Sequence, residues 1–299
     1  MARRHNKGLP IHGWLVIDKP IGLSSAKVVA EVKFKTKAAK AGHGGTLDPL
    51  ATGLLPIALG EATKTSSWAM DGSKVYNFVV RWGGSTETDD REGAIVETSD
   101  VRPSPEQIEA ALPTFIGDIE QMPPAYSALK VDGERAYKKA RRGEVVELKS
   151  RIVTISALKV LNHIDSDHTE FQADCGKGTY IRSLGSDIAR HLGTVGHISV
   201  LRRTKVGPFE INQAISLDKL DDLSDSAALN SYLLPVEAAL ADIPALLLTG
   251  PQAERLHHGQ MVRVLDALDG PCLAMTDGKA IALANVENGE VKAQRVFNL

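Results

Sequence analysis

The chain has 299 residues, of which 43% are hydrophobic and 24% are charged, and its formal net charge is −2. This length exceeds one typical domain and predicts a large domain accompanied by a smaller one. No apolar run reaches the ~18 residues that a membrane-spanning helix needs, so we expect no helical membrane protein.

Charge is distributed unevenly. Residues 1–45 carry nine Lys and Arg against two Asp and Glu, whereas residues 215–299 carry six against twelve. This asymmetry suits a protein that presents one face to a polyanion, although a solvated charged surface is the simpler alternative. Residues 1–8 are basic and no apolar run follows them, so we expect a flexible arm over 1–10 rather than a secretory signal.

In chain order, an apolar strand over 13–19 ends at Pro20. Ser24 and Ser25 are candidate N-caps of a helix that reaches about Lys40. A glycine-rich loop over 41–52 follows. The next expected elements are a strand at 54–59, a helix at 63–70, strands at 75–82 and 93–98, and a helix at 105–115.

Residues 152–161 and 169–175 are expected to pair as a hairpin with its turn near 165–167. A helix over 179–192 and a strand over 196–205 follow. Because strands and helices mix without a regular βα repeat, we predict an α+β fold with a mixed, mostly antiparallel central sheet and flanking helices.

The acidic stretch 217–225 is typical of a domain boundary. Beyond it, short strand-like runs separated by glycines predict a small β-rich domain. They lie at 261–265, 272–276, 280–285 and 291–297. Cys175 and Cys272 are too far apart for a metal or redox motif, which favours a reducing compartment such as the cytoplasm.

The segment GHGGTLDPLATG at 42–53 is the most informative part of the chain. Its glycines permit positive φ angles and close approach of the backbone to a ligand, and Pro49 stiffens the turn. Asp48 lies at the centre of this loop. From the residues alone, Asp48 either caps the turn or is a reactive carboxylate held for chemistry, and dinucleotide binding is excluded because no G-x-G-x-x-G follows a strand.

This loop resembles the active-site loop of the TruB family of tRNA pseudouridine synthases. Further segments resemble the family's motifs in the same order: DKPIGLSS at 18–25, KVY at 74–76, GKGTYIRSL at 176–184 and VLRRT at 200–204. The similarity runs from about residue 13 to residue 209 and is weaker beyond. One departure is Gly44, where the family usually has Thr.

The resemblance implies an isomerase with the pseudouridine synthase fold that converts uridine-55 of the tRNA T-arm to pseudouridine. Asp48 would be its nucleophile, attacking either C1′ of the ribose or C6 of the base. Arg182 would offset the desolvation of that carboxylate, and Tyr76 would stack on the uracil and pass a proton. No cofactor and no metal is implied.

The resemblance also implies substrate-binding residues. His43 would fill the space left by the flipped uridine, and backbone groups of Tyr180 and Leu201 would read the edge of the uracil. Lys19 would flank the site, chiefly as structural support.

For the domains, the resemblance implies a catalytic domain over 11–215, a helical connection over 216–243 and a PUA-like RNA-binding domain over 244–299. Within the first, residues of about 122–150 would form a mobile thumb-like insertion. Its basic residues would contact the T-arm backbone, the alternative being a solvated amphipathic helix. We expect a cytoplasmic monomer.

The alternative functions are an RNA chaperone and a metal-dependent hydrolase. An RNA chaperone that folds tRNA would bind the same RNA without requiring an ionised Asp48. A metal-dependent hydrolase built on His43 and Asp48 lacks the further ligands that a metal site requires.

Overall fold

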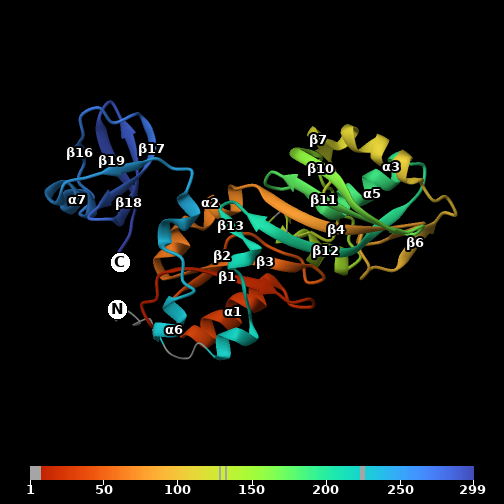
Figure 1. Cartoon of the computed structure of the whole chain (residues 1–299), viewed down its shortest axis with the longest axis horizontal. Coiled ribbons are helices and arrows are strands. Elements are labelled where there is room, and N and C mark those ends of the chain that lie inside the picture. The colour runs from red at the N-terminus through yellow and green to blue at the C-terminus, as the bar shows by residue number, and fades with distance from the viewer. Residues whose placement is uncertain (1–7, 128, 132, 223–225) are drawn as a thin grey trace. The chain divides into compact units, whose positions relative to one another are not determined.

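The computed structural model describes residues 8–127, 129–131, 133–222 and 226–299. These residues form two compact units (Figure 1). Of the described residues, the first comprises 8–48, 54–70, 207–222 and 226–299, and the second comprises 49–53, 71–127, 129–131 and 133–206. Most of the expected basic arm, at 1–7, lies outside the described residues.

The first unit begins with a buried strand. Strand β1 (Gly13–Lys19) lies between β14 (Ile215–Ser216), with which it pairs in parallel, and β3 (Thr52–Leu59). Strand β2 (Ala41–His43) pairs with β3 in antiparallel fashion. These strands hold the two ends of the glycine-rich loop.

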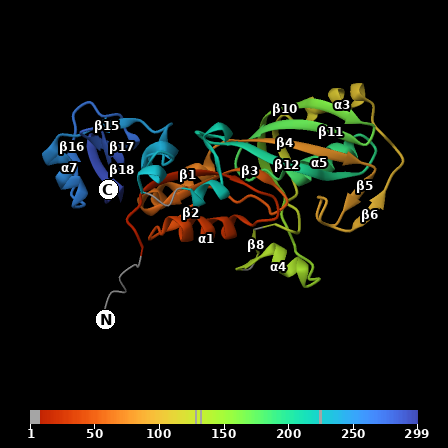
Figure 2. The same cartoon turned by 60° about the horizontal axis from the view of Figure 1, so that its bottom comes forward.

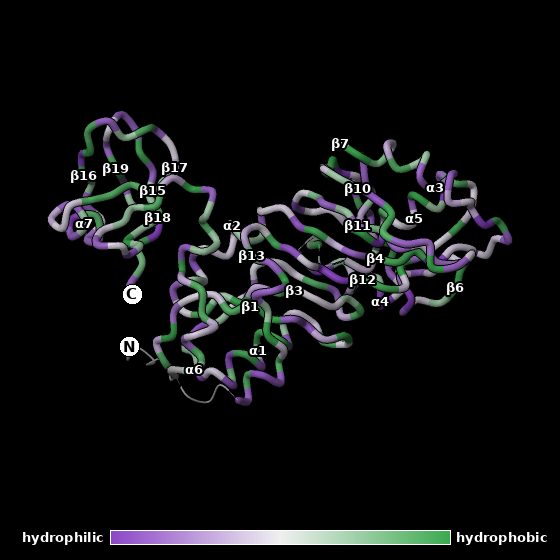
Figure 3. Tube along the Cα trace, viewed as in Figure 1, coloured by the Kyte–Doolittle hydropathy of each residue, from purple (hydrophilic) through white to green (hydrophobic). Residues whose placement is uncertain are grey.

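Helix α1 (Ser25–Thr36) follows β1 and begins, as predicted, with Ser24 as its N-cap. Val28 and Val32 are buried on one face, and Figure 3 shows the alternation of hydrophobic and hydrophilic residues along the helix. The expected extension to Lys40 is wrong, because Lys37 adopts a left-handed conformation with φ of 55° and ends the helix.

The remaining elements of the first unit outside its C-terminal sheet are short. They are η1 (Gly60–Thr65), α2 (Ser66–Asp71), β13 (Phe209–Glu210), η3 (Ile211–Gln213), η4 (Asp218–Asp221), α6 (Ser226–Asn230) and η5 (Val236–Leu240). The helix expected at 63–70 is therefore a 3₁₀ turn continued by one short α-helix.

The second unit is built on an antiparallel sheet (Figure 2). Its strand order is β12–β4–β11–β10–β7, and every neighbouring pair in that order is antiparallel. The strands are β4 (Lys74–Trp82), β7 (Gly117–Gln121), β10 (Arg151–Asp165), β11 (His168–Cys175) and β12 (Gly196–Val206). The predicted α+β class with a mostly antiparallel sheet is confirmed.

Helix α5 (Ile181–His191) packs closely on this sheet. A Cβ placed on its Gly185 would lie 2.5 Å from Ile198 Cδ1 and 3.3 Å from Val80 Cγ2, so glycine permits the close approach. The other elements of this unit are β5 (Gly84–Thr86), β6 (Ile95–Thr98), α3 (Pro105–Ala111), η2 (Leu112–Phe115), β8 (Lys130–Val131), β9 (Glu134–Arg135) and α4 (Ala136–Arg141).

The C-terminal part of the first unit is a five-stranded sheet of order β15–β17–β18–β19–β16. The strands are β15 (Ala245–Leu247), β16 (Val262–Arg263), β17 (Gly270–Thr276), β18 (Lys279–Glu287) and β19 (Glu290–Val296). Helix α7 (Gly250–His257), which was not predicted, covers this sheet and buries Ala253 and Leu256. Within the described residues, no helix is long and apolar enough to cross a membrane.

Candidate active site

The loop that carries Asp48 is the turn of the β2–β3 hairpin. His43 is opposite Ile57 in the hairpin register, and the Gly44 N–H donates to the Pro56 carbonyl at 2.8 Å. Asp48 is half-buried and is the last residue of the first unit before the chain enters the second. The hairpin therefore presents Asp48 on a loop whose base is closed by backbone pairing.

Ser25 fixes the residue that precedes Asp48. Its hydroxyl accepts a hydrogen bond from the Leu47 N–H and donates one to the Leu47 carbonyl, both at 2.8 Å. Ser25 is 3% exposed, so these bonds are shielded from water. Of the two predicted N-cap candidates, only Ser24 caps the helix, by accepting from the Lys27 N–H at 3.3 Å; Ser25 instead holds the loop that carries Asp48.

His43 and Gly44 are both constrained by the loop. The Gly45 N–H donates to Nδ1 of His43 at 3.3 Å, which orients the ring. Gly44 is buried, and a Cβ at this position would lie 2.7 Å from the Ala69 Cβ and 3.2 Å from Trp14 Cζ3. Glycine therefore replaces the family's usual Thr at a position where this chain has no room for a side chain.

Lys19 occupies a structural position. It is 0% exposed, and its ammonium group donates to the carbonyls of Pro20 at 2.9 Å and Leu23 at 2.8 Å. These bonds hold the loop between β1 and α1, which agrees with structural support, and the predicted place of Lys19 beside the substrate stays a prediction.

In the second unit, Tyr76 and Leu201 lie on neighbouring strands. Tyr76 of β4 is paired with Arg203 of β12 and, on its other side, with Ala173 of β11. Leu201 is opposite Phe78 and is 5% exposed, whereas Tyr76 is half-buried. Tyr76 and Leu201 are thus two residues apart in the pairing of β4 with β12.

Arg182, in the first turn of α5, is 4% exposed and links two loops. Its Nη1 donates to the Thr88 carbonyl and its Nη2 to the Tyr126 carbonyl, both at 2.9 Å. Asp90 Oδ2 lies 3.5 Å from Nη1 and is equally buried. A guanidinium held at both terminal nitrogens has little rotational freedom, so the position of this charge within the second unit is fixed.

Sequence reasoning did not identify Asp90. Its Oδ1 accepts from the Thr88 hydroxyl at 2.6 Å and from the Glu92 N–H at 2.9 Å, so it both organises its own turn and faces Arg182. In the sequence, Asp90 stands in a polar run that is typical of a surface turn, and no spacing rule distinguishes it from Asp89.

Tyr180, immediately before α5, has both backbone groups engaged within the protein. Its N–H donates to Oε1 of Gln121 at 2.7 Å, and its carbonyl accepts from Nε2 of Gln121 at 3.0 Å and from the Leu184 N–H at 3.0 Å. A carbonyl oxygen has two lone pairs, and both are used. The expected contact of Tyr180 with uracil stays a prediction; its backbone groups are bonded within the protein, and its ring and hydroxyl are not used in these bonds.

Burial shifts the pKa of several groups near these elements. It lowers the pKa of Lys74 to about 8, with the nearby Arg203 adding to the effect, and raises the pKa of the Cys175 thiol to about 11. Burial likewise raises the pKa of Asp187 to about 6, and Asp89 adds to this shift. Asp89 and Asp187 line a pocket with Ser183 and the segment 145–149.

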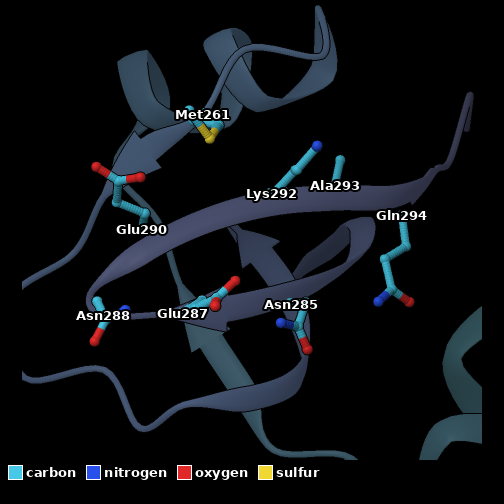
Figure 4. A pocket seen from close by; sticks show the side chains of 8 residues that line it. All are labelled: Met261, Asn285, Glu287, Asn288, Glu290, Lys292, Ala293 and Gln294. Carbon is cyan, nitrogen blue, oxygen red and sulfur yellow. The ribbon is translucent and has the colours of Figure 1, made fainter.

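A second pocket lies on the C-terminal sheet (Figure 4). Asn285, Gln294 and Lys292 line it together with Glu287 and Glu290, so it offers donors and acceptors to a polar ligand. It contains none of the predicted catalytic residues. In the described part of the chain, no group of three or more His, Cys, Asp or Glu is placed to hold a metal ion.

The chain matches two family models. Residues 33–181 match the model described as the TruB family pseudouridylate synthase N-terminal domain, and residues 182–241 match the tRNA pseudouridylate synthase B C-terminal domain. Two similar curated proteins are both named tRNA pseudouridine synthase B. The one from Bradyrhizobium diazoefficiens is 54% identical, covering 97% of this chain and 86% of its own, and that from Rhodospirillum rubrum is 51% identical over the full length of both.

Among solved structures, a Cbf5–Nop10–Gar1 complex contains a chain that matches with a TM-score of 0.74 and 26% identity, covering 95% of this chain and 84% of that one. An H/ACA RNP bound to a substrate RNA containing 2′-deoxyuridine matches with a TM-score of 0.75 and 24% identity, covering 100% and 92%. These matches agree with the fold class predicted from the sequence.

Proposed function

This chain belongs to the TruB family of pseudouridylate synthases, and we propose on that basis that it isomerises uridine-55 in the T-arm of tRNA to pseudouridine. The observation that carries the proposal is identity of about half to relatives of that name over nearly the whole chain, with Asp48 present in the glycine-rich loop. The reaction breaks the C1′–N1 glycosidic bond and joins C1′ to C5. Because nothing is oxidised or reduced, the reaction requires no redox cofactor, and the proposed carboxylate mechanism involves no metal.

Asp48 is the proposed nucleophile, because a carboxylate can both attack and leave. It attacks C1′ of the ribose with departure of N1 of the uracil, or it adds to C6 of the base; in both routes the bond to Asp48 is broken again and the carboxylate is regenerated. Arg182 is the proposed cation that favours the ionised form of Asp48. Its fixed position between the Thr88 and Tyr126 carbonyls supports this role, since an oriented charge in a dry site acts without reorganisation.

The target base must leave the RNA stack before Asp48 reaches it. Stacking on Tyr76 would contribute ~1–3 kcal/mol to holding the extruded uracil, and His43 would replace the base in its former position. Leu201 would read the uracil edge, and the ring of Tyr180 would complete the pocket. Lys19 supports the loop between β1 and α1 from within.

For the RNA partner, we propose that the basic segment over 122–150 and a PUA-like domain over 244–299 contact the tRNA. In α4 and the residue after it, Lys138, Lys139, Arg141 and Arg142 supply positive charge, although Arg142 is paired with Glu134 at 2.7 Å and Glu144 at 2.6 Å. The catalytic domain would span 11–215, joined through 216–243. We infer a cytoplasmic monomer, because the folded RNA supplies the partner surface.

Release of tritium from tRNA labelled at uridine C5 tests the proposal, because C5 loses its hydrogen when it bonds to the sugar. We expect release with the intact protein and a loss of at least about 1000-fold with Asp48→Asn. Asp71→Asn is the matched control, since Asp71 is an exposed carboxylate paired with Lys177, and it should keep full activity. A transcript with cytidine at position 55 should release no tritium.

The same protein samples distinguish the enzyme from the alternative function, an RNA chaperone. Binding of tRNA is measured by filter retention for the intact protein and for Asp48→Asn. If both bind tightly and neither releases tritium, the enzymatic proposal is wrong and the RNA chaperone is the better description.

A further inference from the structure

Gln121 makes a two-point contact with the backbone of Tyr180. It is the last residue of β7 and is 1% exposed, and its side-chain amide accepts from the Tyr180 N–H and donates to the Tyr180 carbonyl. Tyr180 is the N-cap of α5 but has no side-chain capping bond of its own. Gln121 of β7 therefore holds the backbone at the start of α5, as a capping side chain next to the helix normally does.

Arg151 contacts the same tyrosine through its ring. The guanidinium carbon lies 5.1 Å from the centroid of the Tyr180 ring, within the range of a cation–π contact. Arg151 is the first residue of β10 and is directly opposite Gln121 in the β7–β10 register. Gln121 and Arg151, which are paired in the sheet, thus contact the backbone and the ring of Tyr180, respectively.

Hydrogen bonding does not account for the placement of Arg151. Its Nη2 is buried and has no hydrogen-bond partner in the described part of the chain. Leaving a charged donor unpaired is unfavourable, so a compensating contact is expected. The face of the Tyr180 ring is the contact that the structure provides.

We propose that Gln121 and Arg151 are positioning residues for the isomerisation, acting through Tyr180. Gln121 fixes the backbone at the start of α5, and Arg151 fixes the plane of the Tyr180 ring, which is the part of this residue left for the substrate. Arg182 follows Tyr180 by two residues on the same helix. Fixing the backbone of Tyr180 therefore also fixes the position of the Arg182 backbone. This inference rests on the proposed function.

A double-mutant cycle tests the proposal, because a residue that acts through Tyr180 has no effect once the ring is gone. The variants are Arg151→Met, Tyr180→Ala and the double variant, with Lys159→Met as control for loss of an exposed cation on the same strand. The measurements are the single-turnover rate of tritium release at saturating protein and the Kd for tRNA.

We expect Arg151→Met to lower the single-turnover rate ~10–100-fold in the intact background, as displaced catalytic groups do, and by less than about twofold when Tyr180 is alanine. The tRNA Kd should change by less than about threefold, and Lys159→Met should be unaffected. Equal losses in both backgrounds, or no loss in either, would overturn the proposal.

Gln121 is tested with a matched pair. Gln121→Glu keeps the acceptor for the Tyr180 N–H but places an oxygen against the Tyr180 carbonyl, whereas Gln121→Met removes both bonds with little change in volume. We expect a slower chemical step in both. Gln121→Glu should be the less impaired at lower pH, because a protonated carboxyl can donate to the Tyr180 carbonyl while still accepting from the Tyr180 N–H. A fall that simply follows the loss of folded protein, measured by circular dichroism, would contradict a positioning role.

Failure of the inference is distinguishable from failure of the proposed function. If the intact protein releases tritium and the cycle is additive, only the roles of Gln121 and Arg151 are wrong. If the intact protein releases none, both the function and the inference are wrong.

Discussion

Replacing Gly53 by alanine tests how the reactive loop is joined to the sheet of the second unit. Gly53 has φ of 102°, and an ideal Cβ there would lie 2.2 Å from the Arg203 carbonyl oxygen and 2.9 Å from the Arg203 nitrogen. Both atoms are backbone of β12, which pairs with β4 and cannot withdraw as a side chain would. The substitution therefore forces a backbone shift.

The cost has two parts. An L-residue at such a φ is strained by ~1–3 kcal/mol, and overpacking against an immobile neighbour adds ~1–3 kcal/mol. The sum, ~2–6 kcal/mol, is a large fraction of the 5–15 kcal/mol typical of a folded protein. We also expect slower tritium release from the variant while it is still folded, because Gly53 anchors the end of the loop that carries Asp48.

Gly193→Ala is the matched control. Gly193 follows α5 with φ of 72°, and no atom lies within 4 Å of its ideal Cβ, so only the conformational strain remains. Urea denaturation followed by circular dichroism gives both stability changes. Equal losses for the two variants, or full activity of Gly53→Ala, would refute the argument that contact with Arg203 decides the outcome.

Three further predictions concern packing, hydrogen bonding and pH. Gly44→Thr should destabilise by ~1–3 kcal/mol through its collision with Ala69, and adding Ala69→Gly should restore part of the loss in urea denaturation. Ser25→Ala leaves the Leu47 backbone groups without their buried partner, at ~1–3 kcal/mol; it should slow tritium release at an unchanged tRNA Kd, and an unchanged rate would contradict its positioning role. Burial raises the pKa of Asp187 to about 6, so the folded protein binds the extra proton and this group's contribution to stability falls as pH rises from about 4 to 6. Asp187→Asn should therefore stabilise by ~1–2 kcal/mol at pH 7 after allowance for solvent screening, with no gain near pH 4 in the same denaturation assay.

The sequence predicted elements best where local rules act alone. Ser24 caps α1 as expected, and the elements predicted between β4 and β12 occur in the predicted order, although the short strands β5, β7, β8 and β9 were not predicted. The end of α1 was missed because Lys37 takes a left-handed conformation that the sequence does not favour. Helix α7 had a local signal that was overlooked, namely a capping box formed by Thr249 and Gln252 with proline in the first turn.

The candidate site shows a different limit. The family motif identified Arg182, but its anchors are carbonyl groups of Thr88 and Tyr126, which any residue type supplies. Gln121 is distant in sequence from Tyr180 and joins it only through the fold. Such contacts depend on register between strands, and the residues concerned carry no local pattern that marks them.

The closed hairpin around Asp48 has a consequence for the thermodynamics of RNA recognition. Ordering a flexible backbone costs ~1–2 kcal/mol per residue at 25 °C. Pairing of β2 with β3 and the bonds from Ser25 to Leu47 impose that cost when the protein folds, before any RNA is present. More of the free energy of RNA contact is then left to unstack and extrude the uridine, and the entropy change on binding should contain little from this loop.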